Sequence, residues 1–140
     1  MNKGLRSGLR HAAVSLFLFC TTLAYGQNAP GATERTIVIG SCSALEGPSH
    51  SLGVETVAGA NAYFSLSNDE GGVHGRKRKL IAYDDSYDQA KTEPCFNRLM
   101  TDKVFAMGFF VGTPTAVKYV PLAKSNKMPV IGLFTGAQTL

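Results

Sequence analysis

A glycine, two threonines and a proline form the stretch Gly112-Thr113-Pro114-Thr115, which follows the apolar run that begins at Val104. Thr113 suits the N-cap and Pro114 the first position of a helix, so the stretch predicts a strand that turns sharply into a helix. Gly112 would let a ligand approach the backbone, and free N–H groups at a helix N-terminus favour an anion. The stretch therefore suits a carboxylate, although a helix start without a ligand would need the same residues.

Two other corners resemble this one. Residues 40–51 follow the apolar run at Thr36, and Phe134-Thr135-Gly136 follows another that ends at Leu133. Thr135 adds a second hydroxyl group, and Phe134 and Leu52 could supply an apolar wall for a ligand. The alternative is that Thr135 only forms a turn.

Residue types that serve catalysis are not arranged for it. The nucleophile motif Gly-x-Ser-x-Gly, the phosphate loop and the dinucleotide fingerprint Gly-x-Gly-x-x-Gly do not occur in the sequence. Adjacent Asp84 and Asp85 would point to opposite faces of an extended chain, so we expect one to cap a turn and the other to be solvated. His50 and His74 lie in separate loops, and the chain has too few grouped ligands for a metal. We expect no enzyme, no metal and no cofactor.

Apolar runs alternate with helical patterns between Thr36 and Leu133. Strands are expected at residues 36–40, 80–83, 104–111 and 128–133. Helices are expected at about 52–68, from a cap near Asp88 to about Thr101, and from Pro114 onward. This order predicts an α/β fold with a parallel sheet, right-handed crossovers and helices on both faces. The three corners then lie at the carboxyl ends of the strands, where such sheets bind ligands.

Three details of these elements are also predicted. Gly59 and Ala62 are small enough to let the first helix lie close to the sheet. The basic run Arg76–Lys79 predicts a solvated turn before the second strand. Pro121 predicts a kink or a break in the last helix, because proline lacks the backbone N–H.

Residues 1–26 have the three parts of a secretory signal peptide. A basic segment precedes the apolar run 12–24, which is too short to span a bilayer, and Ala24-Tyr25-Gly26 suits cleavage before Gln27. We expect a periplasmic protein with no membrane insertion after signal removal and a flexible leader at residues 27–35. Three of the 14 Lys and Arg residues leave with the signal. The mature chain then has a charge of about +1, which gives no electrostatic case for a nucleic-acid partner.

Two cysteines, Cys42 and Cys95, remain after signal removal. In an oxidising compartment such a pair could form a disulfide, and each cysteine lies near the same end of adjacent elements. Two small buried apolar residues are the alternative reading.

From Thr36 onward the chain resembles the periplasmic substrate-binding proteins of branched-chain amino-acid ABC transporters, the leucine/isoleucine/valine-binding type. Five stretches in the right order carry the resemblance: Ile37–Gly40 with Leu45–Pro48, Gly59–Arg76, Tyr83–Asp88, Gly112–Thr115 and Phe134–Ala137. The resemblance implies a type I periplasmic-binding-protein-like fold, with residues 36–140 as a partial first lobe. Members of the family have a second lobe and are much longer, so we expect a chain truncated within the first lobe.

In that family a free amino acid lies between the two lobes. By position, the resemblance implies that Thr113 and Thr135 contact its carboxylate and that the carbonyl group of Leu133 receives its ammonium. It places Leu52 near the ligand side chain. Gly112 departs from the hydroxyl residue of the leucine-binding members, so one carboxylate contact differs here.

The implied function is extracytoplasmic binding of an amino acid or similar small carboxylate for delivery to an ABC permease. A ligand-sensing regulatory or receptor domain of the same fold is the alternative, and it would continue into a transmembrane or signalling segment. Because the second lobe would supply half of the contacts, we expect the isolated chain to show no measurable amino-acid affinity by calorimetry, whereas micromolar binding would contradict the need for both lobes.

Overall fold

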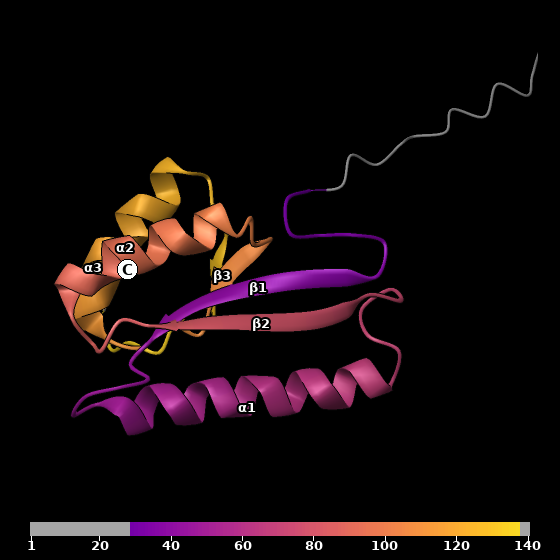
Figure 1. The fold of residues 1–140 in the computed structure, drawn as a ribbon, viewed down its shortest axis with the longest axis horizontal. Helices are drawn as coiled ribbons and strands as arrows, with labels where there is room; N and C mark the ends of the chain where they lie inside the picture. Colours follow the sequence, from indigo (N-terminus) through magenta and orange to yellow (C-terminus); the bar gives the residue numbers. More distant parts are fainter. Residues whose placement is uncertain (1–28, 138–140) are drawn as a thin grey trace, which may run out of the picture.

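Strands and helices alternate along residues 29–137, the part of the chain that the computed structural model describes (Figure 1). The elements are β1 (Thr36–Ser43), α1 (His50–Asp69), β2 (Lys77–Asp84), α2 (Gln89–Thr101), β3 (Ala106–Gly108), α3 (Thr113–Ser125) and β4 (Val130–Ile131). The expected signal peptide, residues 1–26, lies outside the described residues. Within the described range, no helix is both long enough and apolar enough to cross a membrane.

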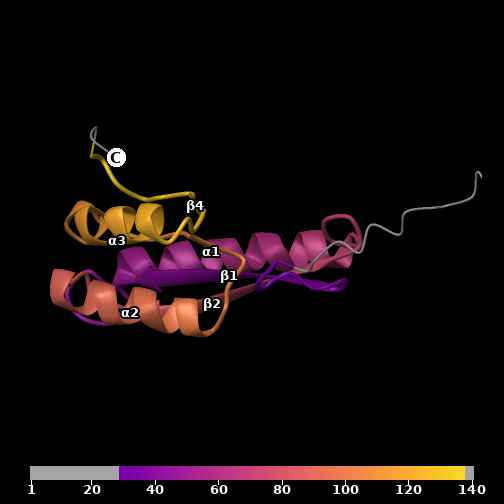
Figure 2. The same cartoon turned by 90° about the horizontal axis from the view of Figure 1, so that it is seen from above.

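The four strands form one parallel sheet in the order β2-β1-β3-β4. Helix α1 covers one face, while α2 and α3 lie next to each other on the other face (Figures 1 and 2). The predicted parallel sheet with helices on both faces is therefore confirmed. The strand order changes direction between β1 and β3, which pair side by side, so the carboxyl ends of these two strands are the expected place for a ligand.

The larger core lies between the sheet and the pair α2 and α3. Its biggest fully buried side chains are Tyr119, Phe96, Phe110, Leu99 and Met107. A smaller cluster under α1 contains Ile39, Phe64 and Ala106. Gly53, and not the predicted Gly59, brings α1 close to the chain, because a Cβ atom at Gly53 would collide with the backbone of Ala44. Gly59 is exposed, and a Cβ atom added there would have no neighbour within 4 Å.

Residues 29–35 belong to the expected flexible leader 27–35, and they pack beside the sheet; residues 27 and 28 lie outside the described part of the chain. The carbonyl group of Gly31 accepts a hydrogen bond from the N–H of Val38 at 2.8 Å, and Ala32 forms an antiparallel bridge with Ile37. Gly31 also lies so close to the backbone at Val104 and Phe105 that a side chain would not fit. Backbone pairing, which the composition of the leader does not indicate, fixes this segment.

The basic run also differs from its prediction, because Lys77, Arg78 and Lys79 lie within β2 and not in a turn. The guanidinium of Arg78 packs 5.0 Å from the ring centroids of both Tyr63 and Phe64 on α1. Charged residues on an edge strand such as β2 also disfavour pairing with another chain.

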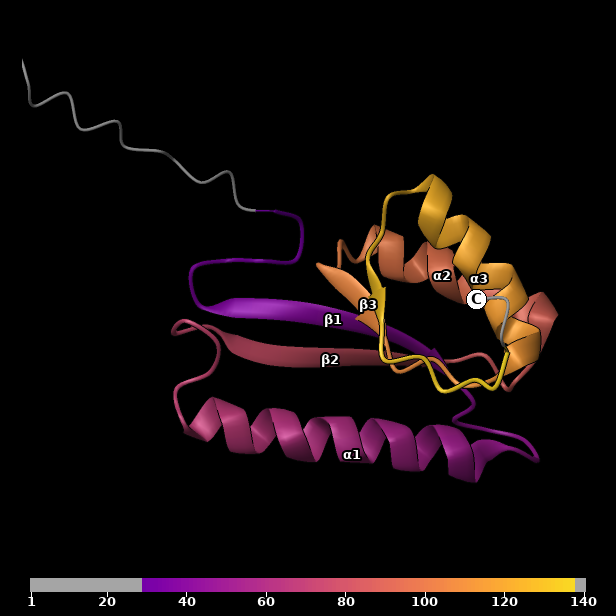
Figure 3. The same cartoon turned by 180° about the vertical axis from the view of Figure 1, so that it is seen from behind.

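Helix α3 is continuous through Pro121, so the predicted break does not occur. The strands β3 and β4 are shorter than the predicted runs of residues 104–111 and 128–133. Phe109 and Gly132, which follow β3 and β4 closely, have φ angles of 60° and 61° and turn the chain out of the extended conformation. Figure 3 shows β4 running beside β3 at the edge of the sheet.

Candidate functional site

The corner between β3 and α3 turns at Gly112, which occupies the N-cap position with φ 110° and ψ 137°. Helix α3 therefore begins at Thr113, and the prediction that Thr113 is the N-cap is wrong. Glycine takes that position because L side chains rarely adopt so positive a φ. The hydroxyl group of Thr113 therefore makes no capping hydrogen bond to α3, and it lies 2.8 Å from the hydroxyl group of Thr135.

Backbone hydrogen bonds join the corner after β3 to the corner after β4. The N–H of Gly112 donates to the carbonyl group of Phe134 at 3.0 Å, and the N–H of Phe134 donates to the carbonyl group of Phe110 at 2.9 Å. The Thr135 hydroxyl also accepts from the N–H of Ala137 at 3.2 Å. Thr113 and Thr135 are 22 positions apart in sequence but are brought together by this pairing. We call Gly112, Thr113, Phe134 and Thr135 the paired corners.

Several donors at the paired corners remain available for a ligand. The N–H of Ala116 donates to the carbonyl group of Gly112, whereas those of Thr113 and Thr115 donate to no other described residue. One of the two hydroxyl protons of Thr113 and Thr135 is used in their mutual hydrogen bond, which leaves the other free to donate. The first turn of α3 contains no acidic residue. This arrangement suits an anion, since it combines backbone donors, a hydroxyl donor and the positive end of the helix dipole.

Two serine side chains at the end of β1 form hydrogen bonds to Phe109, which precedes the paired corners in the chain. The hydroxyl groups of Ser41 and Ser43, both fully buried, donate to the carbonyl group of Phe109 at 3.2 and 2.9 Å. These bonds hold Phe109 in its left-handed conformation, which is rare for an aromatic residue. We did not identify either serine from the sequence; the alternating pattern Ser41-Cys42-Ser43 at the end of an apolar strand was the available signal.

The other predicted ligand residues lie at the same end of the sheet in different surroundings. Phe134 is exposed at 54% and Leu52 at 44%, so both present apolar surface to solvent. Leu52 is in the first turn of α1, across the sheet from α3 (Figure 1). Among the described residues, it shares no hydrogen bond and no core cluster with the paired corners. The side chain of Leu133 packs against the larger core, and its carbonyl group accepts no hydrogen bond from another described residue.

A turn after β2 packs against Gly112 and is fixed by Asp84. The carboxylate of Asp84 accepts hydrogen bonds from the N–H groups of Leu45, Glu46 and Ser86 at 2.8, 2.9 and 3.0 Å, and from the Ser86 hydroxyl. Burial raises the pKa of Asp84, but the hydrogen bonds from Ser86 and from the loop after β1 outweigh it, so the pKa lies below its usual value. The ionised Asp84 therefore joins the loop after β1 to the turn after β2 by hydrogen bonds. This agrees with the prediction that one of the two adjacent acids caps a turn.

Asp85 is fully buried, which corrects the expectation that it is solvated. One carboxyl oxygen accepts from the N–H of Tyr87 at 3.0 Å, whereas the other has no hydrogen-bond partner among the described residues. Burial raises the pKa of Asp85 to about 6. The buried hydroxyl group of Tyr119 also lacks a partner in this part of the chain, and burial followed by the charge of Asp85 raises its pKa to about 12.

Substitution of Gly112 by alanine is expected to lower the unfolding free energy by about 1–3 kcal/mol, the usual cost of one strongly strained residue. The added Cβ atom would collide with the ring of Tyr87, and the φ of 110° is unfavourable for any L side chain. Urea unfolding followed by far-UV circular dichroism measures the change.

Gly59→Ala in α1 is the matched control. It adds the same methyl group where nothing lies within 4 Å and the backbone is helical, so it should stabilise the protein by about 0.5–1 kcal/mol. Equal effects of the two substitutions would contradict a special conformation at Gly112.

Comparison with known proteins places this geometry in a wider context. A family model described as periplasmic binding protein matches residues 36–139. The solved structure of a possible leucine/isoleucine/valine-binding protein from Rhodopirellula baltica SH 1 has a TM-score of 0.72 and 37% identity, and the match covers 75% of this chain and 29% of that one. A search of curated proteins finds no significant match.

Two further structures come from proteins with other ligands in their descriptions. A fatty acid ABC transporter substrate-binding protein from Thermomonospora curvata has a TM-score of 0.69 and 29% identity, with 79% of this chain and 27% of that one covered. A solute-binding protein of an ABC transporter from Rhodopseudomonas palustris BisB5, solved with 3,4-dihydroxybenzoic acid, has a TM-score of 0.61 and 28% identity, with 72% and 28% covered. The chain spans less than a third of the length of these structures.

Proposed function

The chain belongs to the periplasmic binding protein family, and on that premise we propose that its paired corners bind the carboxylate group of a small organic acid for an ABC importer. The observation that carries the proposal is the pairing of Thr113 with Thr135 beside the unused N–H groups of Thr113 and Thr115. Proteins of this family bind substrates and are not enzymes. Binding outside the cytoplasm and delivery to a permease are parts of the same proposal.

The relatives support a carboxylate as the shared ligand group. Their descriptions name branched-chain amino acids, a fatty acid and 3,4-dihydroxybenzoic acid, which differ in every other part of the molecule. All three ligand types carry a carboxyl group. A site built from backbone N–H groups and one hydroxyl recognises this group without regard to what is attached to it.

The remaining predicted residues would serve the rest of the ligand. The unused carbonyl group of Leu133 would accept a hydrogen bond from an ammonium where the ligand is an amino acid. The exposed side chains of Phe134 and Leu52 would contact an apolar portion. An exposed helix N-terminus contributes only about 0.3–1 kcal/mol to anion binding, and each hydrogen bond to a charged group adds about 1.5–3 kcal/mol. Because a millimolar dissociation constant corresponds to about 4 kcal/mol, we expect affinity in that range for this part of the site alone.

Titration of the purified ¹⁵N-labelled chain with isoleucine tests the proposal by NMR. The amide signals of Gly112, Thr113, Thr115 and Thr135 are expected to shift and to saturate in the range of about 1–10 mM. Isoleucinol, which has the same side chain and ammonium but no carboxylate, should leave these signals in place. Equal shifts with isoleucinol, or shifts confined to other amides, would overturn the proposal.

Thr113→Val should weaken isoleucine binding by about fivefold, since it removes one hydrogen bond worth about 1 kcal/mol while it preserves the shape of the side chain. Thr101→Val is the matched control. Its hydroxyl donates to the carbonyl group of Asn97 on the exposed side of α2 and should not affect binding.

A further inference from the structure

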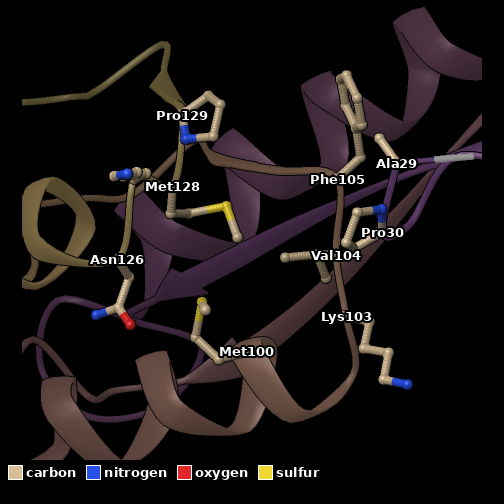
Figure 4. Close-up of a pocket in the computed structure, with 10 residues that line it drawn as sticks. Ala29, Pro30, Met100, Lys103, Val104, Phe105, Asn126, Met128 and Pro129 are labelled. Atoms are coloured by element: carbon tan, nitrogen blue, oxygen red, sulfur yellow. The ribbon is translucent and has the colours of Figure 1, made fainter. Parts of the chain in front are cut away.

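A cavity of about 550 Å³ lies where the chain enters β3 and β4 (Figure 4), at the opposite end of these strands from the paired corners. Its walls are the last turn of α2, the segments that lead into β3 and β4, and the residues Ala29 and Pro30. These segments precede the strands, whereas the paired corners follow them. The cavity is therefore separate from the carboxylate site, and its volume is within the range of roughly 300–1,000 Å³ that is usual for small-molecule sites.

The interior of the cavity is apolar and adaptable. Met100 comes from α2 and Met128 from the segment before β4, and Figure 4 shows both side chains directed into the space between them. Val104 and Phe105 complete the wall, and the Phe105 ring is still 40% exposed. Methionine side chains are flexible and polarisable, so they adjust to apolar ligands of different shape.

The rim of the cavity is cationic. Lys103 and Lys127 line it, and no aspartate or glutamate does so among the described lining residues. Each lysine follows the last turn of a helix, α2 or α3, with a φ of 55° or 53°. This left-handed conformation is costly for residues other than glycine, asparagine and aspartate. Two separate helix ends thus deliver a lysine to one cavity in a conformation that a glycine would adopt at lower cost.

We propose that this cavity is a second ligand site that takes an alkyl chain with an anionic headgroup, either a carboxylate or a phosphate. The chain would lie between Met100 and Met128, where it would replace water against apolar surface. The headgroup would remain at the mouth beside Lys103 and Lys127, whose long side chains can follow it into solvent. The proposal does not depend on the paired corners.

Methyl NMR of the chain labelled with ¹³C at its methionine methyl groups gives a direct test. Sodium decanoate, kept below its micelle concentration, is expected to shift the methyl signals of Met100 and Met128. Met107 is fully buried in the core and should not move, which makes it an internal control. Decyl phosphate should act like decanoate, while acetate, which has the headgroup but no chain, should have no effect. No shift with decanoate, or equal shifts of all three signals, would overturn the proposal.

A lysine near a helix C-terminus also stabilises the helix through its dipole, whether or not a ligand binds. Reversing the charge of both lysines and measuring affinity distinguishes a role in ligand binding from this role in stability. The double substitution Lys103→Glu with Lys127→Glu should weaken decanoate binding by about fivefold or more and strengthen the binding of decyltrimethylammonium. Lys79→Glu with Lys118→Glu changes the net charge equally at exposed positions of β2 and α3 and should alter neither affinity. Equal affinities in both double variants would show that the lysines do not contact a headgroup and would overturn the proposal.

Decanoate also carries a carboxylate and could bind at both sites, so the NMR signals of each site must be evaluated separately. Shifts of the Thr113 and Thr115 amides report the paired corners, whereas shifts of the Met100 and Met128 methyl groups report this cavity. Failure at one set of signals leaves the other result intact.

Discussion

Replacement of both Cys42 and Cys95 by alanine is expected to lower the unfolding free energy by about 4 kcal/mol. The structure joins the two cysteines in a disulfide with a Cα–Cα distance of 6.1 Å and a sequence separation of 53. Such a crosslink removes conformations from the unfolded chain, and the effect grows with the size of the loop that it closes. Both cysteines are also buried in the larger core, so loss of their sulfur atoms adds a packing cost.

Urea unfolding of the double variant measures this loss. The wild-type chain in the presence of a reductant is the matched control, because it keeps both sulfur atoms and loses only the crosslink. The reduced wild type should therefore lie between the oxidised wild type and the double variant. An unchanged midpoint after complete reduction would contradict a stabilising disulfide.

The same disulfide connects the core to the candidate site. Cys42 lies between Ser41 and Ser43, whose hydroxyl groups hold the carbonyl group of Phe109. Its partner Cys95 lies on α2, so the crosslink fixes the end of β1 against that helix. Reduction should consequently shift the amide signals of Phe109 and Thr113, even if the chain stays folded.

The overall architecture could be predicted from the sequence because it depends on local patterns. Apolar runs that alternate with helical spacing allow few arrangements other than a parallel sheet with covered faces. The ends of the strands could not be predicted in the same way. The third apolar run continues to Val111, but the strand β3 ends at Gly108 because Ser41 and Ser43, far away in sequence, hold Phe109 in a left-handed conformation.

The sequence indicates the separate stretches that form the candidate site, but it does not show that they lie together. Gly112 and Thr135 each stood out by residue type, yet the bond between their corners depends on β3 and β4 being neighbours in the sheet. The role of Thr113 was mistaken for this reason: its hydroxyl pairs with Thr135, while Gly112 supplies the N-cap. The sequence alone does not decide between a disulfide and two free cysteines, because the disulfide depends on the distance between β1 and α2.

The adjacent acids illustrate the same limit. Alternation along an extended chain correctly separated Asp84 from Asp85, and Asp84 caps a turn as predicted. Burial of Asp85 could not be foreseen, because it depends on how segments distant in the sequence pack around it. A carboxyl group that loses its water without gaining a partner for each oxygen is costly to ionise.

Asp85→Asn is expected to stabilise the protein at pH 8 by about 3 kcal/mol and to have little effect at pH 4. The pKa of Asp85 rises from its usual 3.8 to about 6 on folding, so the folded state binds the proton more tightly than the unfolded chain. The stability contributed by protonated Asp85 is therefore complete below pH 3.8, and it is lost as the pH rises through 6. Asparagine stays neutral at every pH and keeps an acceptor for the N–H of Tyr87.

Urea unfolding of both proteins at pH 4 and pH 8 gives the comparison. The lowered pKa of Asp84 acts in the opposite direction, since its stabilising effect is lost on acidification, but Asp84 is present in both proteins and cancels from the difference. Glu55→Gln is the matched control, because it removes one negative charge from an exposed position of α1 and should change the stability equally little at both pH values. A stability difference between wild type and Asp85→Asn that does not vary with pH would show that Asp85 is not the buried group that titrates near pH 6.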